Sequence, residues 1–262
     1  MSQQYKAIFS DIDGTLLNSQ HQISPQTAKS IQRVLRQGIP FILASARPPL
    51  AMTPFYQQLN AHCPMICYGG ALILDADLQP LYSIELAQAD FEKVSHILEQ
   101  VPDLSLNYYS GLDWFCPNPE NKWTVQEGEI THLRASLKPK YLTHVHKILV
   151  IADAKLILVT EKVLKALFPH LAIHRSKNEY LEIMHPNASK ANALQFMQQK
   201  LGIKQENIIA FGDNFNDLDM LEYAGLGVAM GNAPEQIKQA VERVTLDNNH
   251  DGLAVILDEL FL

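Results

Sequence analysis

The chain has 262 residues, and its 28 aspartate and glutamate residues outnumber its 21 lysine and arginine residues, so the formal net charge is −7 with histidine neutral. At roughly 150 residues per domain, this length allows one large α/β unit or a core with an inserted module. The negative charge argues against nucleic acid as the main partner, because duplex binding depends on clustered Lys and Arg. The hydrophobic fraction of 47% and charged fraction of 19% are typical of a folded globular protein.

Neither a signal peptide nor a membrane partner is expected. The apolar run at residues 7–9 is interrupted by Asp11, and the later apolar stretch at residues 148–152 is far shorter than the roughly 20 residues that cross a bilayer. The residues between Cys63 and Cys67 include Met65 and Ile66, which favours a buried strand over half of a zinc site. An odd number of cysteines without a regular framework is typical of a reducing compartment, so we expect a soluble cytoplasmic protein.

The first 85 residues alternate strand and helix patterns. Ser24 and Pro25 form an N-cap followed by proline at the first helical position, and the helical spacing that follows ends at Gly38. The apolar residues before Asp11 are continuous rather than alternating, as in a parallel sheet that is covered on both faces. The predicted elements in order are strand 5–10, helix 24–37, strand 39–44, strand 65–67 and a hairpin continuation at 71–74.

Residues 86–185 have a different pattern, typical of a mixed α+β module of about a hundred residues. The elements predicted there are helix 89–100, strands 104–109, 113–116 and 145–152, and helix 154–167. The α/β alternation then resumes with helix 189–201, strand 207–211, helix 217–223, strand 226–229, and helices 234–241 and 252–260. We therefore predict a doubly wound, Rossmann-like parallel-sheet core made of residues 1–85 and 186–262, interrupted by an α+β domain at 86–185.

Two carboxylates, Asp11 and Asp13, directly follow the first predicted strand and precede Gly14. Open α/β sheets bind ligands at this end of their strands. Two like charges about 4 Å apart repel by roughly 4 kcal/mol at an effective dielectric constant of 20, so we expect a cation nearby or a proton on one of the groups. Taken alone, the motif is equally compatible with a glycine turn assisted by aspartate.

Further polar residues follow later predicted strands. Ser45, Ala46 and Arg47 close the second strand, where a hydroxyl and free backbone N–H groups suit an anion. Lys190 opens a helix and supplies a point charge for phosphate, although a solvated lysine is the commoner reading of such a position. Residues 212–217 place two carboxylates and two amides in a strand-to-helix loop, and these are the hard oxygen ligands that magnesium prefers.

In this order, the motifs resemble the four motifs of the haloacid dehalogenase-like phosphatases. They are Asp11-Ile12-Asp13-Gly14-Thr15, Ser45-Ala46-Arg47, Ser189-Lys190 and Gly212-Asp213-Asn214-Phe215-Asn216-Asp217. The α+β insertion between the second and third motifs, with residues 230–233 and 251–252 after the fourth, is similar to the Cof-type sugar-phosphatase branch. The resemblance covers nearly the whole chain, whereas the inserted module matches only in length and type.

The resemblance implies a phosphoric monoester hydrolase that acts through an aspartyl-phosphate. Asp11 is then the nucleophile, and Asp13 the acid and base that serves the leaving group and water. Magnesium is expected at Asp11, at the backbone carbonyl of Asp13 and at Asp213, with Asp217 ordering the ligand shell. The residues implied to bind the transferring phosphoryl oxygens are Ile12, Ser45, Ala46, Lys190 and Asn216. The implied substrate is a small soluble phosphomonoester such as a sugar phosphate, and the inserted domain acts as a cap that selects it.

The chain departs from the family pattern in the segment 69–71, which reads Gly-Gly-Ala where relatives commonly have Asn-Gly-Ala. An amide near the leaving group is thereby removed, so Gly69 and Gly70 are candidate substrate contacts whose effect falls on substrate choice. Ala46 stands where a glycine is usual. Arg47 either reaches the substrate or forms a buried ion pair within the core.

Several alternatives stay open. A phosphomutase uses the same aspartate but returns the phosphoryl group to a sugar, and a non-catalytic phospholigand-binding protein keeps only the fold. A receiver-type phosphoacceptor needs neither Asp13 nor a large cap. His144 and His146 share one face of a predicted strand and resemble a metal pair, but a third ligand is not evident. The aromatic residues of the inserted module either line its substrate face or form its core; they are Tyr108, Tyr109, Trp114, Phe115 and Trp123.

Overall fold

The computed structural model describes residues 5–261. By compactness these residues form two units, which are treated separately below. The first consists of the described residues up to Ala46, Met52–Leu81 and the described residues from Ser189 onward, and the second of Arg47–Ala51 and Tyr82–Ala188. The second unit begins slightly before and ends slightly after the predicted insertion at residues 86–185; the roles assigned to these two parts stay predictions.

The first unit is built on an eight-stranded sheet with the order β14-β13-β12-β1-β2-β3-β4-β5. From β14 through β3 every neighbouring pair is parallel, and β4 joins β3 in antiparallel orientation. The strands are β1 (Ala7–Ser10), β2 (Phe41–Ala44), β3 (Met65–Cys67), β4 (Leu72–Leu74), β5 (Pro80–Ser83), β12 (Ile208–Gly212), β13 (Leu226–Ala229) and β14 (Arg243–Val244). The predicted α/β core with a parallel sheet is confirmed.

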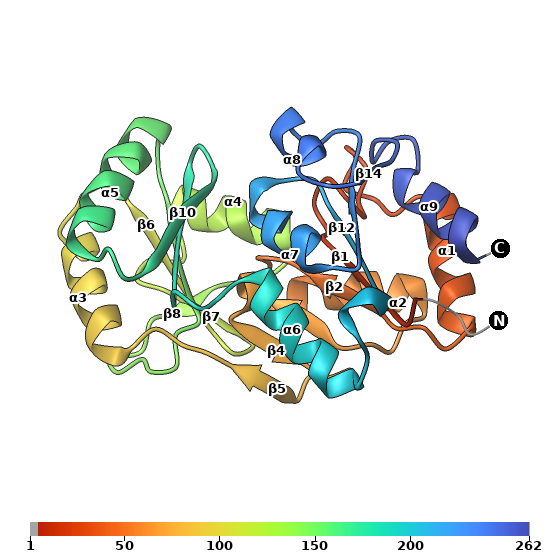
Figure 1. Ribbon diagram of the computed structural model, residues 1–262. Coiled ribbons are helices and arrows are strands. Elements are labelled where there is room, and N and C mark those ends of the chain that lie inside the picture. Colours follow the sequence, from red (N-terminus) through yellow and green to blue (C-terminus); the bar gives the residue numbers. More distant parts are fainter. Residues whose placement is uncertain (1–4, 262) are drawn as a thin grey trace. The chain divides into compact units, whose positions relative to one another are not determined.

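Helices cover both faces of this sheet, with α1 and α9 packed together on one side and α6 and α7 on the other (Figure 1). Every residue of the central strands β1, β2 and β12 is buried, which explains why their apolar residues do not alternate with polar ones. The helices are α1 (Pro25–Arg36), α2 (Thr53–Leu59), α6 (Lys190–Leu201), α7 (Leu218–Tyr223), α8 (Glu235–Gln239) and α9 (Gly252–Phe261), with 3-10 turns at Tyr68–Gly70, Gln205–Asn207 and Phe215–Asp217.

The helix starts follow from capping side chains. The hydroxyl of Ser24 accepts a hydrogen bond from the backbone N–H of Thr27 at 3.0 Å and so caps α1. Ser189 caps α6 in the same way, because its hydroxyl accepts from the N–H of Asn192 at 3.1 Å. The α6 helix ends at Gly202, whose φ of +64° is readily adopted by glycine. The second of these caps fixes the position of Lys190, the first residue of α6.

The second unit has a six-stranded sheet with the order β10-β11-β9-β6-β7-β8. Its strands are β6 (Ser105–Ser110), β7 (Asp113–Cys116), β8 (Ser136–Leu137), β9 (Lys147–Ile151), β10 (Ala172–Lys177) and β11 (Tyr180–Met184). Its helices are α3 (Gln88–Glu99), α4 (Lys122–Thr131) and α5 (Ala154–Leu167), and a 3-10 turn lies at Pro49–Ala51. One face of the sheet joins residues of α3 and α5 in an apolar core that includes Ile148, Val150, Leu181 and Ile183.

The aromatic residues of the inserted module mostly belong to its interior. Tyr108 is fully buried and meets the ring of Phe91 edge-on, with ring centroids 5.5 Å apart. Tyr109 is also fully buried and stacks on Trp114 at 5.7 Å. Of the two interpretations left open for this group, the structure favours the core for these residues, while Trp123 is half-buried at the start of α4.

The predicted strand at residues 145–152 is too long at its N-terminal end, and the histidine pair inferred from it is wrong. Strand β9 begins at Lys147, after both histidines, and His144 has a φ of +61° that no strand residue adopts. His146 is buried, and its Nδ1 accepts from the backbone N–H of Gly111 at 3.1 Å while its Nε2 lies 2.9 Å from the Ser83 hydroxyl. The two side chains therefore do not share a strand face.

Within residues 5–261, no helix is both long and apolar enough to span a bilayer. Cys63, Cys67 and Cys116 are buried free thiols. Burial raises the pKa of the Cys67 thiol, and Cys67 lies in the buried strand β3, which agrees with the strand prediction for residues 65–67.

Candidate active site

The side chain of Asp11 lies at the C-terminal end of the central strand β1. Its backbone N–H donates to the carbonyl of Phe211 at 3.0 Å, which continues the pairing between β1 and β12. The side chain is only 8% exposed. Burying an unpaired carboxylate costs free energy, so the groups that contact Asp11 determine whether it is ionised.

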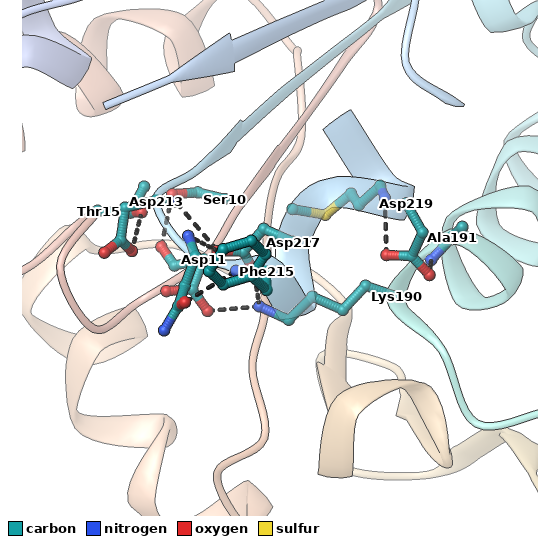
Figure 2. Close-up of polar contacts among 11 residues, drawn as sticks. Ser10, Asp11, Thr15, Lys190, Ala191, Asp213, Phe215, Asp217 and Asp219 are labelled. Atoms are coloured by element: carbon teal, nitrogen blue, oxygen red, sulfur yellow. Dashed lines mark hydrogen bonds and ion pairs between the residues drawn. The ribbon is translucent and has the colours of Figure 1, made fainter. Parts of the chain in front are cut away.

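Lys190 forms an ion pair with Asp11. Its ammonium group donates to Oδ1 of Asp11 and to Oδ1 of Asp217, each at 2.5 Å (Figure 2). Lys190 is 2% exposed and Asp217 is fully buried, so these are ion pairs in the protein interior. Lys190 stands at the start of α6 and Asp217 at the end of the turn after β12, and the three residues come from three separate sequence motifs. The structure thus brings together Asp11, Lys190 and Asp217, three of the predicted site residues.

Asp217 uses both carboxylate oxygens within the fold. Oδ1 faces Lys190, and Oδ2 accepts hydrogen bonds from the backbone N–H groups of Asp213 and Asn214, each at 3.0 Å. Gly212 lies so close that a Cβ there would approach the Cβ of Asp217 to 2.5 Å. Asp217 therefore orients the loop that carries Asp213.

Asp213 faces the Asp11 loop from the end of β12. The hydroxyl of Thr15 donates to its Oδ1 at 3.0 Å (Figure 2), and the amide of Asn232 donates to its Oδ2 at 3.2 Å. Gly14 has a φ of +83°, and a Cβ at that position would come within 2.4 Å of Oδ2 of Asp213. Position 14 therefore requires glycine both for its backbone conformation and for the close approach of the carboxylate.

Several carboxylates lie close together in this site, near the ammonium group of Lys190. Burial and the neighbouring Asp217 raise the pKa of Asp11 well above its ordinary value, despite the opposing effect of Lys190. Burial followed by the charge of Asp217 raises the pKa of Asp213 to about 6. Burial by itself lowers the pKa of Lys190, but the carboxylates of Asp11 and Asp217 outweigh it and the net shift is upward. The site thus has more negative charge than Lys190 alone balances.

Three carboxylates lie close together at this place. Asp11, Asp213 and Asp217 each offer an oxygen, and these atoms all lie within 4.8 Å of one another. Hard oxygen donors in a small cluster suit Mg²⁺. Asp13, which was predicted beside them, is exposed, and its charge adds to the rise in the pKa of Asp11. The arrangement combines a buried carboxylate, a fixed ammonium group and a set of oxygen donors that suit a metal ion.

The remaining predicted residues follow strand ends or lie in turns. Ile12 is buried beside Asp11, and Ser45 is buried directly after β2. Ala46 and Arg47 are both half-buried, and both interpretations of Arg47 stay predictions. Asn216 is exposed in the turn Phe215–Asp217.

Gly69 and Gly70 form part of an unusual turn after β3. Tyr68, Gly69 and Gly70 have φ values of +51°, +61° and +108°, three consecutive residues with positive φ. The N–H of Gly69 donates to the carbonyl of Ser45 at 2.9 Å. A Cβ on Gly70 would lie 2.2 Å from the carbonyl oxygen of Ser189. Gly70 therefore packs against Ser189, the residue before Lys190. The sequence predicted Gly70 as a substrate contact and did not predict this packing role.

Replacing Gly70 by alanine is expected to impair both stability and activity. The variant must shift the Ser189 backbone, and a displacement of about 1 Å at the neighbouring Lys190 corresponds to roughly a hundredfold loss of rate. Gly38→Ala is the matched control, because Gly38 also has a positive φ (+78°) but nothing lies within 4 Å of its Cβ position. Gly38→Ala should lower stability by about 1–2 kcal/mol from backbone strain alone and leave activity intact. Thermal unfolding and initial rates compare the two, and equal rates in both variants would contradict the role given to Gly70.

Three polar residues support the site without having been predicted as site residues, although Asn232 lies in the segment 230–233 that carried the Cof-type resemblance. Asn232 donates to the carbonyl of Gly14 at 2.9 Å as well as to Asp213, which joins the two acidic loops. Asn248 donates to the carbonyl of Leu17 at 2.7 Å, and its own N–H donates to Oδ1 of Asn232 at 3.1 Å. Asp219 accepts from the N–H of Ala191 at 3.3 Å (Figure 2), next to Lys190.

A family profile of haloacid dehalogenase-like hydrolases matches residues 8–257. The chain belongs to this family. It is 46% identical over 258 residues to a Haemophilus influenzae protein with a provisional phosphatase name, and the alignment covers 98% of each chain. It is 30% identical to the 5-amino-6-(5-phospho-D-ribitylamino)uracil phosphatase of Bacillus subtilis, with 96% of each chain covered. A crystal structure of a haloacid dehalogenase-like hydrolase from Bacteroides thetaiotaomicron superimposes with a TM-score of 0.88 at 29% identity, covering 98% of this chain and 100% of that one.

This membership confirms the resemblance seen in the four motifs, down to the Cof-type branch of the haloacid dehalogenase-like hydrolases. It also confirms that the chain is an enzyme, a hydrolase of the phosphoric monoester class. The cluster of Asp11, Lys190, Asp213 and Asp217 lies entirely within the matched residues 8–257.

Proposed function

We propose that this haloacid dehalogenase-like hydrolase is a Mg²⁺-dependent phosphatase that hydrolyses small soluble phosphomonoesters in the cytoplasm. The observation that carries the proposal is the buried Asp11–Lys190–Asp217 arrangement with Asp213 beside it. A nucleophilic carboxylate, a permanent cation and additional oxygen donors are the groups that phosphoryl transfer needs, because its catalysis consists mainly of positioning and charge stabilisation.

In the proposed reaction, the oxygen of Asp11 that Lys190 does not hold attacks phosphorus. An Asp11 oxygen–phosphorus bond forms while the bond from phosphorus to the leaving oxygen breaks, and protonated Asp13 gives its proton to that oxygen. Asp13 then takes a proton from water as the water oxygen attacks phosphorus and the Asp11 carboxylate departs. Asp13 is exposed whereas Asp11 is buried, and two carboxylates in unlike environments suit divided roles.

The donor set fits the metal that the family uses. Asp11, Asp213 and the backbone carbonyl of Asp13 would hold Mg²⁺, which neutralises negative charge between nucleophile and phosphate when bound. Asp217 has both oxygens engaged, by Lys190 and by two backbone N–H groups, so we assign it to orienting the ligands rather than to the metal itself. The raised pKa values of Asp11 and Asp213 support a cation here, since the site is short of positive charge.

The transferring phosphoryl oxygens are assigned to Lys190, the Ser45 hydroxyl, the Asn216 amide and the backbone N–H groups of Ile12 and Ala46. Ser45 is buried directly after β2 and Lys190 is buried at the start of α6, which supports a fixed anion site. Preorganised donors of this kind stabilise the transition state because they need no reorientation during the reaction.

We assign substrate selection to the α+β part of the chain, residues 86–185, as the cap of the enzyme. The names of the relatives support a phosphorylated small molecule as substrate, but they name different compounds. One relative is a pyridoxal phosphate phosphatase of Escherichia coli, which is 28% identical over an alignment that covers 95% of this chain and 96% of the relative. A sugar phosphate or a comparable metabolite fits this range.

Release of inorganic phosphate tests the function directly. The purified protein with MgCl₂ is assayed on p-nitrophenyl phosphate and a panel of sugar phosphates, with EDTA as the matched condition. Phosphate release that needs Mg²⁺ and no phosphorylated activator supports a phosphatase. Transfer between sugar positions without phosphate release would indicate a phosphomutase, and no turnover of any compound would indicate a phospholigand-binding protein.

Replacing Asp13 by asparagine should affect alkyl and aryl esters differently. A general acid contributes about 10²–10⁴-fold where the leaving group needs a proton, so an alkyl phosphate should lose that factor. The p-nitrophenolate ion is a good leaving group and should lose much less in the first step. Single-turnover rates for p-nitrophenyl phosphate and glycerol 3-phosphate measure the difference. An equal loss for both esters would remove the acid role of Asp13.

A further inference from the structure

Asn232 follows the end of β13, at the same edge of the sheet as the acidic cluster. The N–H of Met230 donates to the carbonyl of Gly212 at 3.0 Å, so the chain stays paired with the end of β12. A Cβ on the next residue, Gly231, would lie 2.7 Å from the backbone nitrogen of Asp247, in the segment after β14. The backbone before Asn232 is therefore held on two sides, and this fixes the point from which the Asn232 side chain extends.

The side-chain amide of Asn232 bridges two loops of the site. Its Nδ2 donates to the carbonyl of Gly14 at 2.9 Å and to Oδ2 of Asp213 at 3.2 Å, while its Oδ1 accepts from the backbone N–H of Asn248 at 3.1 Å. An asparagine amide has two N–H donors and one oxygen, so both donors are used within the fold. No N–H of Asn232 is left for a substrate, which makes this residue a support of the site rather than a contact.

The carboxylate of Asp213 keeps room for a cation beside these bonds. Each of its oxygens accepts from one side chain, Oδ1 from the Thr15 hydroxyl at 3.0 Å (Figure 2) and Oδ2 from Asn232. A carboxylate oxygen has two lone pairs, so one on each oxygen remains for a metal ion. Donors on both oxygens also fix the rotation of the carboxylate, and this is how the groups behind a metal ligand orient it.

Asn248 connects this bridge to the base of the Asp11 loop. Its side-chain amide donates to the carbonyl of Leu17 at 2.7 Å, and the N–H of Leu17 donates to the carbonyl of Ile12 at 2.9 Å, which closes the loop. Its backbone N–H meanwhile holds the oxygen of Asn232. Three segments that are far apart in the sequence are thus joined through two amides, and Asn232 is the member that reaches a carboxylate of the cluster.

We propose that Asn232 is a positioning residue that holds Asp213 and the Asp11 loop at the separation that Mg²⁺ requires, an inference that rests on the metal dependence in the proposed function. Loss of the amide lets the Asp213 carboxylate rotate and its loop move away from Gly14. Mg²⁺ is then bound more weakly, while its ligands are unchanged. Removal of such a group behind a metal ligand lowers metal affinity by about 10–100-fold. Asn232 is exposed, so water replaces part of the lost bonding and the lower end applies.

The test measures the Mg²⁺ affinity of Asn232→Ala and wild type without substrate. The unfolding temperature is followed from EDTA to saturating MgCl₂, and its rise gives an apparent Kd for Mg²⁺. We expect this Kd to be about tenfold higher in Asn232→Ala. The unfolding temperature in EDTA verifies that the variant is folded. The kcat for p-nitrophenyl phosphate at saturating MgCl₂ should change far less than the Kd, because the loaded site has the same ligands.

Asn249→Ala is the matched control, because it also removes an exposed amide and lies directly after Asn248. The Oδ1 of Asn249 accepts from the backbone N–H of Ser19 at 2.9 Å, beyond the end of the Asp11 loop. Its replacement should leave the Kd for Mg²⁺ unchanged.

Two outcomes would overturn the inference while the metal assignment stands. One is an unchanged Kd in Asn232→Ala, with or without a fall in unfolding temperature in EDTA, since that result describes a purely structural residue. The other is an equal increase of Kd in Asn232→Ala and Asn249→Ala. Wild type whose unfolding temperature does not respond to Mg²⁺ would refute the metal assignment and the inference together. Wild type that binds Mg²⁺ but releases no phosphate from any ester would contradict the proposed function alone, so the failures are distinguishable.

Discussion

Asp11→Asn is expected to reduce phosphatase turnover by about 10⁴-fold or more, the usual effect of removing a residue that acts as the nucleophile. The amide keeps the shape of the carboxylate but does not form the covalent phosphate ester. The same variant should be as stable as wild type or more stable. Burial and the charge of Asp217 raise the pKa of Asp11, which means that its ionised form is disfavoured in the folded protein at neutral pH. A neutral amide removes that penalty, and Lys190 keeps its contact with Asp217.

The loss of turnover and the unchanged or greater stability of Asp11→Asn can each be measured directly. Initial rates of phosphate release give the loss of turnover, and thermal unfolding in EDTA gives stability without a contribution from metal. Asp77→Asn is the matched control for loss of one negative charge, because the Asp77 side chain is 79% exposed. It should leave both quantities unchanged. Rates for Asp11→Asn near those of wild type would refute the nucleophile assignment.

Much of the core could be predicted because its signals are local. Strands that are buried on both faces have continuously apolar sequences. Ser24 and Ser189 are N-cap residues that indicate where α1 and α6 begin. The meeting of Asp11 and Asp213 also follows from the sequence, since the carboxyl ends of parallel strands lie at one edge of a sheet. Lys190 was placed with them only through the resemblance to the family's motifs. Once that resemblance was recognised, residues nearly 180 positions apart could be assigned to one site.

Other features depend on contacts that no local pattern encodes. Helix α4 was not predicted, because it buries Thr124, Glu127 and Thr131 and so lacks an apolar stripe. Strands β10 and β11 were missed for a similar reason: β10 is half exposed, and β11 contains Glu182. These elements gain stability from partners far away in the chain rather than from their own composition.

The supporting amides and glycines of the site show the same limit. Asn232 and Asn248 sit in polar loops that resemble any turn, and their importance becomes visible only when Gly14 and Leu17 are found beside them. Gly70 was interpreted as a substrate contact because of its motif, but its distance to Ser189 gives it a packing role. The sequence thus indicates which groups perform chemistry better than which groups hold them in place.

Lys190→Met should have the largest effect on stability of any single substitution in the site. Methionine fills much of the same volume but leaves Asp11 and Asp217 buried without their shared cation. Removing one partner of a buried ion pair destabilises by about 3–5 kcal/mol, which corresponds to a fall of roughly 6–20 °C in unfolding temperature for a chain of this size. Activity should be lost as well, since the proposed function assigns the Lys190 ammonium group to the transferring phosphoryl oxygens.

The pH dependence of that loss follows from the sign of the carboxylate shifts. The pKa of Asp11 is already raised in the wild-type fold, and loss of the neighbouring ammonium raises it further. A carboxyl group with a raised pKa in the folded state stabilises the fold below its unfolded pKa and loses that contribution as pH rises through the folded pKa. The loss of stability in Lys190→Met should therefore be greatest near pH 8 and become smaller toward pH 5.

Urea unfolding in EDTA at both pH values measures this loss. Lys200→Met, at an exposed position later in the same helix, serves as the control. A deficit that is independent of pH would mean that lost packing, and not the unpaired carboxylates, accounts for the destabilisation.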